Sequence, residues 1–137
     1  MYLLDTNIVS ELRRARPHGA VVARLESARE EDLHLSAVTI GEIQAGVEIT
    51  REQDQAKAAE IEAWLEQVAE TYNILSMDAP DLPFLGSPRA SRAGPPRRDA
   101  MIAATATLHG LTVVTRNVRD FDRLGVAAFN PFDGKLG

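Results

Sequence analysis

Hydrophobic and polar positions along the chain predict alternating strands and helices. In several segments apolar residues recur three or four positions apart, which is typical of amphipathic helices. An example is the stripe Ile61, Trp64, Leu65 and Val68. Short apolar runs, typical of buried strands, occupy residues 1–4, 33–36, 73–77, 111–115 and 127–129. Helices are expected between a cap at Thr6 and a stop at Pro17, and over about 20–28, 38–50, 54–71, 100–109 and 119–124.

This alternation favours a parallel sheet with helices on both faces. The crossovers between parallel strands are expected to be right-handed. Ligands in such sheets bind at the carboxyl ends of the strands. One segment departs from the pattern: Pro80 to Pro96 holds five of the seven prolines and has no periodicity, so it is expected to be irregular or a short, broken helix.

Composition narrows the class of protein. The 137 residues suffice for one domain, and 45% hydrophobic and 26% charged residues are ordinary for a globular chain. The absence of cysteine excludes disulfides and thiolate zinc sites. No apolar run approaches the ~20 residues of a membrane span, and Asp5 interrupts the apolar start before a signal-peptide core could form. A cytoplasmic, single-domain protein without membrane contact is expected.

Charge is unevenly distributed. The net charge of −5 is not typical of a nucleic-acid binder. Residues 48–70 contain seven acids and two bases, whereas residues 86–123 contain seven arginines and three acids. The first segment fits a solvated acidic helix. The second is either an ordinary mixed surface or a place where anions dock.

Four carboxylates fall where strands end or helices begin. Asp5 ends the first strand, and Glu42 lies in the first turns of the helix after the second strand. Asp99 opens the helix DAMIAATA, and Asp120 lies just beyond the strand LTVVT. Each alone has a structural explanation, such as a helix cap or a solvated surface acid. Together they are expected to converge at one edge of the sheet.

Converging carboxylates repel one another, and a divalent cation is the usual compensation. Carboxylate and water oxygens suit Mg²⁺ or Mn²⁺, which can activate water for attack on a phosphodiester. The chain has no GxSxG elbow, HExxH motif or phosphate-binding glycine loop that would indicate other chemistry. His18, His34 and His109 are interpreted as structural.

Four segments carry a family resemblance: MYLLDTNIVSEL, LSAVTIGEIQAG, DAMIAATATLHGLTVVTRNVRDF and GVAAFNPF. They resemble the PIN-domain family, and within it the VapC-type toxins of bacterial type II toxin–antitoxin systems. The resemblance spans the chain except for residues 78–98. This segment is shorter and richer in proline than the corresponding segment of the family pattern. It implies one domain, residues 1–137, with a three-layer α/β/α fold and a mainly parallel sheet of four to five strands.

The resemblance also implies a Mg²⁺- or Mn²⁺-dependent endoribonuclease. The family positions matching Asp5, Asp99 and Asp120 hold metal directly or through water, and the position matching Glu42 supports the site. Family toxins typically form homodimers, cut a structured RNA such as a tRNA or rRNA, and are neutralised by a VapB-type antitoxin.

Further polar positions belong to this expected site. By resemblance, Thr6, Thr115 and Asn117 line it. Arg116 and Arg119 are candidate phosphate contacts. The basic excess of residues 89–98 is expected to form an RNA track or an antitoxin contact.

Three alternatives remain open from the sequence. A phosphoacceptor signalling domain would need paired acids after the first strand and a late lysine, whereas Asp5 stands alone and the only lysines are Lys57 and Lys135. A non-catalytic RNA- or protein-binding module would share the fold, although all four acids are present. A related nuclease acting in RNA processing or on DNA would share the site.

Overall fold

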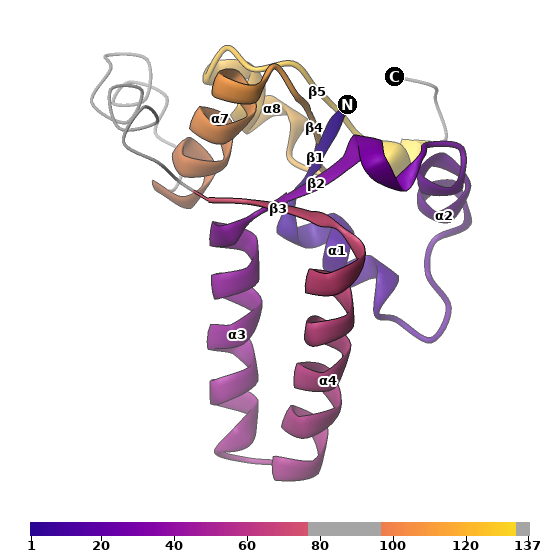
Figure 1. Ribbon diagram of the computed structural model, residues 1–137, viewed down its shortest axis with the longest axis vertical. Coiled ribbons are helices and arrows are strands. Elements are labelled where there is room, and N and C mark those ends of the chain that lie inside the picture. The colour runs from indigo at the N-terminus through magenta and orange to yellow at the C-terminus, as the bar shows by residue number, and fades with distance from the viewer. Residues whose placement is uncertain (77–96, 134–137) are drawn as a thin grey trace.

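The computed structural model describes residues 1–76 and 97–133, built around a five-stranded sheet (Figure 1). The strand order is β3-β2-β1-β4-β5, and every neighbouring pair is parallel. The strands are β1 Tyr2–Leu4, β2 Leu33–Ser36, β3 Asn73–Leu75, β4 Thr112–Val114 and β5 Ala128–Phe129. The predicted parallel α/β fold is therefore confirmed, with a strand in each of the five expected segments.

The expected helices are also present, although the first ends at Leu12, several residues before the expected stop at Pro17. They are α1 Thr6–Leu12, α2 Gly19–Glu26, α3 Ala37–Arg51, α4 Gln55–Thr71, α7 Arg97–His109 and α8 Val118–Arg123. Two 3-10 helices, η1 Glu30–Asp32 and η3 Pro131–Asp133, were not predicted, because three residues are too few to show a period. None of the described helices is long and apolar enough to span a membrane.

Two predicted helix starts are wrong. Asp5, not Thr6, is the N-cap of α1, since its carboxylate accepts the Thr6 N–H and its backbone is extended. Asp99 lies in the first turn of α7, which begins two residues earlier. The end of α7 is as predicted: Gly110 follows it with a φ of 66°, a left-handed conformation that glycine adopts readily. The predicted irregular segment, residues 80–96, lies outside the described residues.

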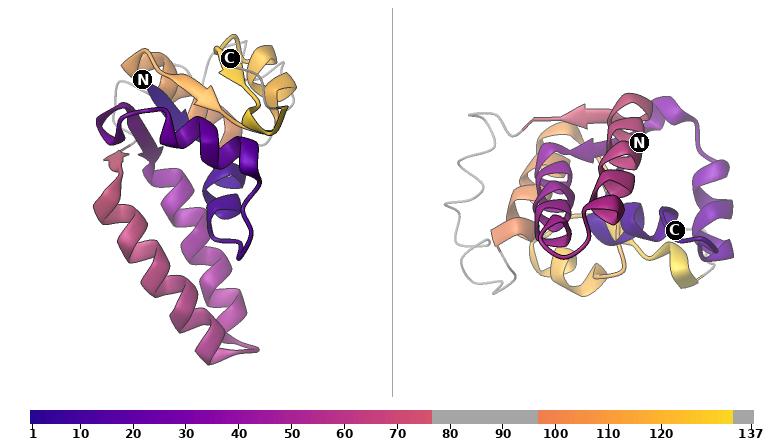
Figure 2. Two further views of the ribbon diagram at one scale, coloured as in Figure 1. Left: turned by 90° about the vertical axis from the view of Figure 1, so that its right-hand side faces the viewer. Right: turned by 90° about the horizontal axis from the view of Figure 1, so that it is seen from below.

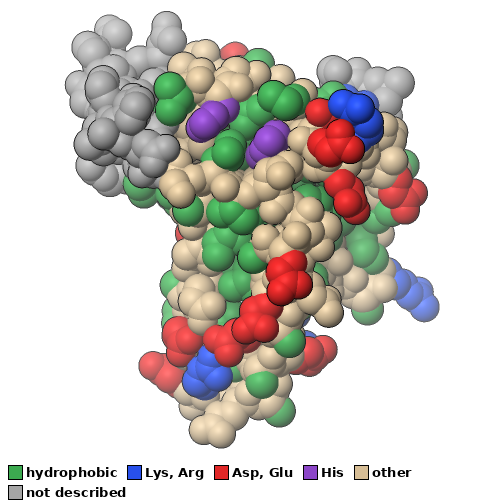
Figure 3. Space-filling model, viewed as in Figure 1, with side chains coloured by type: hydrophobic (Ala, Val, Ile, Leu, Met, Phe, Trp, Pro, Cys, Tyr) green, Lys and Arg blue, Asp and Glu red, His purple; other side chains and the backbone are tan. Residues whose placement is uncertain are grey.

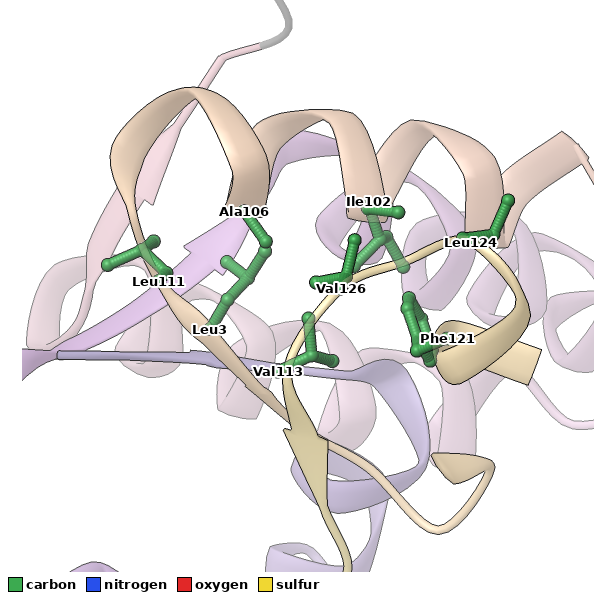
Figure 4. Close-up of a cluster of buried hydrophobic side chains, with 9 residues drawn as sticks. Leu3, Ile102, Ala106, Leu111, Val113, Phe121, Leu124 and Val126 are labelled. Atoms are coloured by element: carbon green, nitrogen blue, oxygen red, sulfur yellow. The ribbon is translucent and has the colours of Figure 1, made fainter. Parts of the chain in front are cut away.

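The sheet separates two hydrophobic clusters, because successive strand residues point to opposite faces. Leu3 and Val113 pack on one face against α7 and α8, in the cluster drawn in Figure 4. Leu4 and Val114 pack on the other face against α1, α2 and α4. The views in Figure 2 show helices on both sides of the sheet. The three-layer α/β/α arrangement expected for the chain is therefore confirmed.

Helices α3 and α4 form an antiparallel hairpin that extends away from the sheet (Figures 1 and 2). Acidic side chains follow this hairpin on the face shown in Figure 3. Arg51 binds two of them, with Arg51 Nε 3.1 Å from Glu48 Oε2 and Arg51 Nη2 2.9 Å from Glu62 Oε2. Most acids of α4 are exposed, as expected for a solvated acidic helix.

Candidate active site

The carboxyl edge of the sheet brings distant segments together. Strand β1 has β2 on one side and β4 on the other, so the strand order reverses between β1 and β4. Ligands of parallel α/β sheets bind at such a switch point. Because Leu4 pairs with Val114, Asp5 and Thr115 leave the sheet as neighbours, and Asp5 N–H still donates to Val114 O at 2.9 Å.

Asp5 is held by several donors although its side chain is only 1% exposed. Its Oδ1 accepts the Thr6 N–H at 2.8 Å. Its Oδ2 accepts the Asn7 amide at 3.2 Å and the Thr115 hydroxyl at 2.8 Å. Thr115 Oγ1 accepts in turn the Asn117 N–H at 2.9 Å. These bonds fix the carboxylate in one orientation at the switch point.

A second chain of contacts links α1 to α3. Ser36 caps α3 and turns the chain at the end of β2. One and two turns later, Thr39 and Glu42 face α1: the Thr6 hydroxyl donates to Glu42 Oε1 at 2.9 Å, and Thr39 Oγ1 lies 3.3 Å from Thr6 Oγ1. Thr6 therefore connects the half-buried Glu42 carboxylate to the helix that Asp5 caps.

Asp99 lies at the same edge. Only Gly110 and Leu111 separate α7 from β4, so α7 runs antiparallel to the strand it enters and its first turn lies beside the carboxyl ends of the strands. The Asp99 side chain is 1% exposed, and α7 contacts α3. A carboxylate in such a position requires hydrogen bonds or cations to stabilise its charge.

Asp120 lines an open hollow beside this edge. It is half-buried on α8, which begins three residues after Thr115. The hollow has a volume of about 510 Å³, and its lining includes Asn117, Arg116 and Arg119. The two arginine side chains are exposed. Of the predicted polar residues that follow β4, all but the buried Thr115 therefore line one cavity.

These side chains do not form a closed metal cage. Within residues 1–76 and 97–133, no three carboxylate or histidine side chains are grouped so that they could hold a metal ion. The chemistry of the donor set nevertheless fits a hard cation, since the predicted site supplies carboxylate and hydroxyl oxygens. The structure links Asp5 and Glu42 through Thr6 and places Asp99 and Asp120 on elements that start at the same edge.

Glu11 is a charged residue that the sequence did not single out. It lies on α1, and its side chain is 6% exposed. Burial raises the pKa of this carboxyl, but the His18 N–H and the Arg14 and Arg116 guanidinium groups outweigh burial and lower the pKa below its ordinary value. The sequence held one signal for a buried Glu11. It lies three residues after the apolar Ile8, and this spacing places both residues on the same face of the helix.

His34 is half-buried on the inner strand β2. Neither ring nitrogen has a hydrogen-bond partner within the described part of the chain. Burial lowers the pKa of His34 below its ordinary 6.5, and the N-terminal amine and His109 add to this, while Asp32 opposes it. The folded protein therefore binds this proton less well than the unfolded chain.

We expect the free energy of unfolding to fall as the pH drops below 6.5, the ordinary pKa of His34. Above that pH the imidazole is neutral in both states, so its contribution is fully present. His34→Gln cannot titrate and is expected to flatten this loss between about pH 7 and 5. Urea unfolding of both proteins across that range measures the difference. Equal pH slopes for the two proteins would contradict the assignment.

Comparison with known proteins identifies the family. The PIN domain model matches residues 2–127. Toxin FitB of Neisseria gonorrhoeae is 37% identical over 139 aligned positions, covering 96% of this chain and 99% of FitB. VapC ribonuclease Y4jK of Sinorhizobium fredii is 32% identical, covering 97% and 99%. The crystal structure of FitAcB from Neisseria gonorrhoeae superposes with a TM-score of 0.87 at 37% identity, covering 96% and 99%. The chain belongs to the PIN-domain family and resembles the VapC-type toxins within it.

Proposed function

We propose that this protein is a divalent-metal-dependent endoribonuclease that acts as the toxin of a toxin–antitoxin pair. The observation that carries the proposal is the Asp5 carboxylate, buried at the switch point and oriented by Thr115, a residue 110 positions away. The names of its relatives, a toxin and a VapC ribonuclease, support the same activity.

In this proposal Asp5, Asp99 and Asp120 hold Mg²⁺ or Mn²⁺ directly or through water. Glu42 supports the site from α3, through its bond with Thr6. A bound divalent cation lowers the pKa of a coordinated water and neutralises charge on the phosphodiester.

The residues of this chain orient the reactants. Thr115 and Asn7 hold Asp5 Oδ2, so that the carboxylate keeps one direction when RNA approaches. The Asn117 N–H, bonded to Thr115 Oγ1, keeps the Thr115 hydroxyl proton directed at Asp5. The 510 Å³ hollow beside Asp120 is open to solvent-borne substrate and offers Arg116 and Arg119 to its phosphates.

The partners follow from the toxin assignment. We expect a VapB-type antitoxin to bind and block this site, and the toxin to form a homodimer. The substrate is expected to be a structured RNA, a tRNA or an rRNA. The predicted RNA track or antitoxin contact over residues 89–98 lies almost wholly outside the described residues, and nothing is described of the Arg97 and Arg98 side chains.

Removing the metal tests the enzyme assignment. Purified protein is expected to cut RNA with Mg²⁺ or Mn²⁺, to lose this cleavage in excess chelator, and to regain it when metal is restored, because the carboxylates alone cannot activate water. Gel analysis of labelled tRNA, rRNA and single-stranded DNA measures the cleavage. Cleavage that persists in chelator would refute metal dependence. Cleavage of DNA but not RNA would favour a DNA nuclease, and binding without any cleavage would favour the non-catalytic module.

A further inference from the structure

Arg116 lines the hollow beside Asp120 and is held there by several contacts. Its guanidinium Cζ lies 3.7 Å from the centroid of the Phe132 ring, so the two groups stack. Its Nη2 lies 3.9 Å from Glu11 Oε1. Its backbone N–H donates to Asn7 Oδ1 at 3.2 Å. A side chain that is 54% exposed is thus fixed at both its ends.

Glu11 is itself anchored before it meets Arg116. Its Oε2 accepts the His18 N–H at 3.0 Å, and its Oε1 accepts Arg14 Nη1 at 3.3 Å. The His18 ring packs edge-on against Phe132, with centroids 5.1 Å apart. The acid and the ring that contact Arg116 are therefore braced by the same loop after α1.

The 3.9 Å contact with Glu11 is an ion pair longer than a hydrogen bond, so it does not engage the guanidinium donors. Arg116 also lies next to the reaction centre: Asn7, which accepts its backbone N–H, donates to Asp5 Oδ2. A guanidinium with a fixed plane and available donors is suited to bidentate binding of a phosphate.

We propose that Arg116 binds a backbone phosphate of the RNA beside the cleavage site and that Glu11 is a positioning residue, which together with Phe132 holds the guanidinium in its binding orientation. This rests on the proposed function, since it presumes an RNA substrate. It distinguishes Arg116 from Arg119, which lines the same hollow. A positioning role also explains why the acidic Glu11 lies beside Arg116, although Arg116 is proposed to bind an anionic phosphate.

The test measures binding without cleavage. A fluorescently labelled single-stranded RNA is titrated with protein in chelator at several salt concentrations. Arg116→Gln is expected to weaken binding about tenfold and to reduce the slope of log affinity against log salt by about 0.7, the value for one lost phosphate contact on a single strand. Arg29→Gln is the matched control: this exposed arginine lies before β2, at the opposite edge of the sheet, and its loss should change neither quantity.

A double-mutant cycle tests Glu11. Glu11→Gln keeps an oxygen that can accept the His18 N–H, and it is expected to weaken RNA binding several-fold in the wild-type background but not in Arg116→Gln. Arg116→Lys, which keeps the charge but not the planar stack, should retain the salt slope and lose affinity. An unchanged salt slope in Arg116→Gln would overturn the phosphate contact. Equal effects of Glu11→Gln in both backgrounds would show that Glu11 acts on the fold alone. Because binding is read in chelator, absence of RNA cleavage with metal would refute the proposed function separately.

Discussion

Asp5→Asn is expected to lower kcat/KM for RNA cleavage at least about 100-fold, or about 2.7 kcal/mol of transition-state stabilisation. The substitution removes a negative charge from the switch point while keeping the shape of the side chain. It costs little capping, because asparagine is as good an N-cap as aspartate. Asn7 and Thr115 both donate to the other carboxylate oxygen, Asp5 Oδ2, which becomes an NH₂ group, so both contacts must rearrange, and we expect a loss of about 1–2 kcal/mol in the free energy of unfolding. Initial cleavage rates with Mn²⁺ and a thermal unfolding curve measure the two effects.

Asp122→Asn is the matched control for this substitution. It removes the same charge from an exposed position on α8, two residues from Asp120, and should leave both rates and stability unchanged. Wild-type rates in a folded Asp5→Asn protein would refute the catalytic role of Asp5. A loss in both variants would instead show that overall charge, not the switch-point carboxylate, controls RNA cleavage.

The fold follows closely from local patterns in the sequence. Period-two burial is visible where Leu3 and Leu4 face opposite clusters. The short apolar runs were enough to predict every strand, although β3 and β5 are not buried. One of the errors concerns adjacent residues with similar propensities. Asp5 and Thr6 are both good N-caps, and only the backbone conformation decides between them.

The site was predicted less completely, because tertiary contacts decide which acids meet. Asp5 could be recognised from its place after an apolar strand, whereas Thr115 was expected in the site only from the family resemblance. That Thr115 donates to Asp5 follows from the register of β1 and β4, which the structure supplies. The bond between Thr6 and Glu42 depends on how α3 packs against α1, which no local pattern reports. Glu11 was missed because one acid in a short amphipathic helix normally lies on its solvent face.

The metal-binding roles of the four acids stay predictions. The sequence predicts that the carboxyl ends of the strands lie at one edge of the sheet. In the structure, the elements that carry the four acids begin at this edge. Within the described residues, their side chains do not form a group of three that could hold a metal ion.

The largest expected effect on stability is that of Phe121→Ala. The ring is fully buried in the cluster that includes Ile102, Val113 and Val126, where α8 packs on the sheet (Figure 4). Truncation leaves a cavity that these neighbours only partly fill, and a loss of about 3–5 kcal/mol is expected. That is a large share of the ~5–15 kcal/mol that stabilises a typical domain. Urea unfolding should show a lower midpoint with an unchanged slope.

Phe121 lies on α8 next to Asp120, so loss of its ring is expected to disturb the candidate site as well as the core. The ring belongs to the cluster that packs α8 against the sheet, and α8 carries Asp120, which lines the hollow. We therefore expect Phe121→Ala to lose RNA cleavage at temperatures where it is still mostly folded. Leu108→Ala is the control, because it truncates an exposed leucine on the same helical layer and should change stability by less than about 0.5 kcal/mol. Equal losses of stability in the two variants would mean that this cluster does not hold α8 in place.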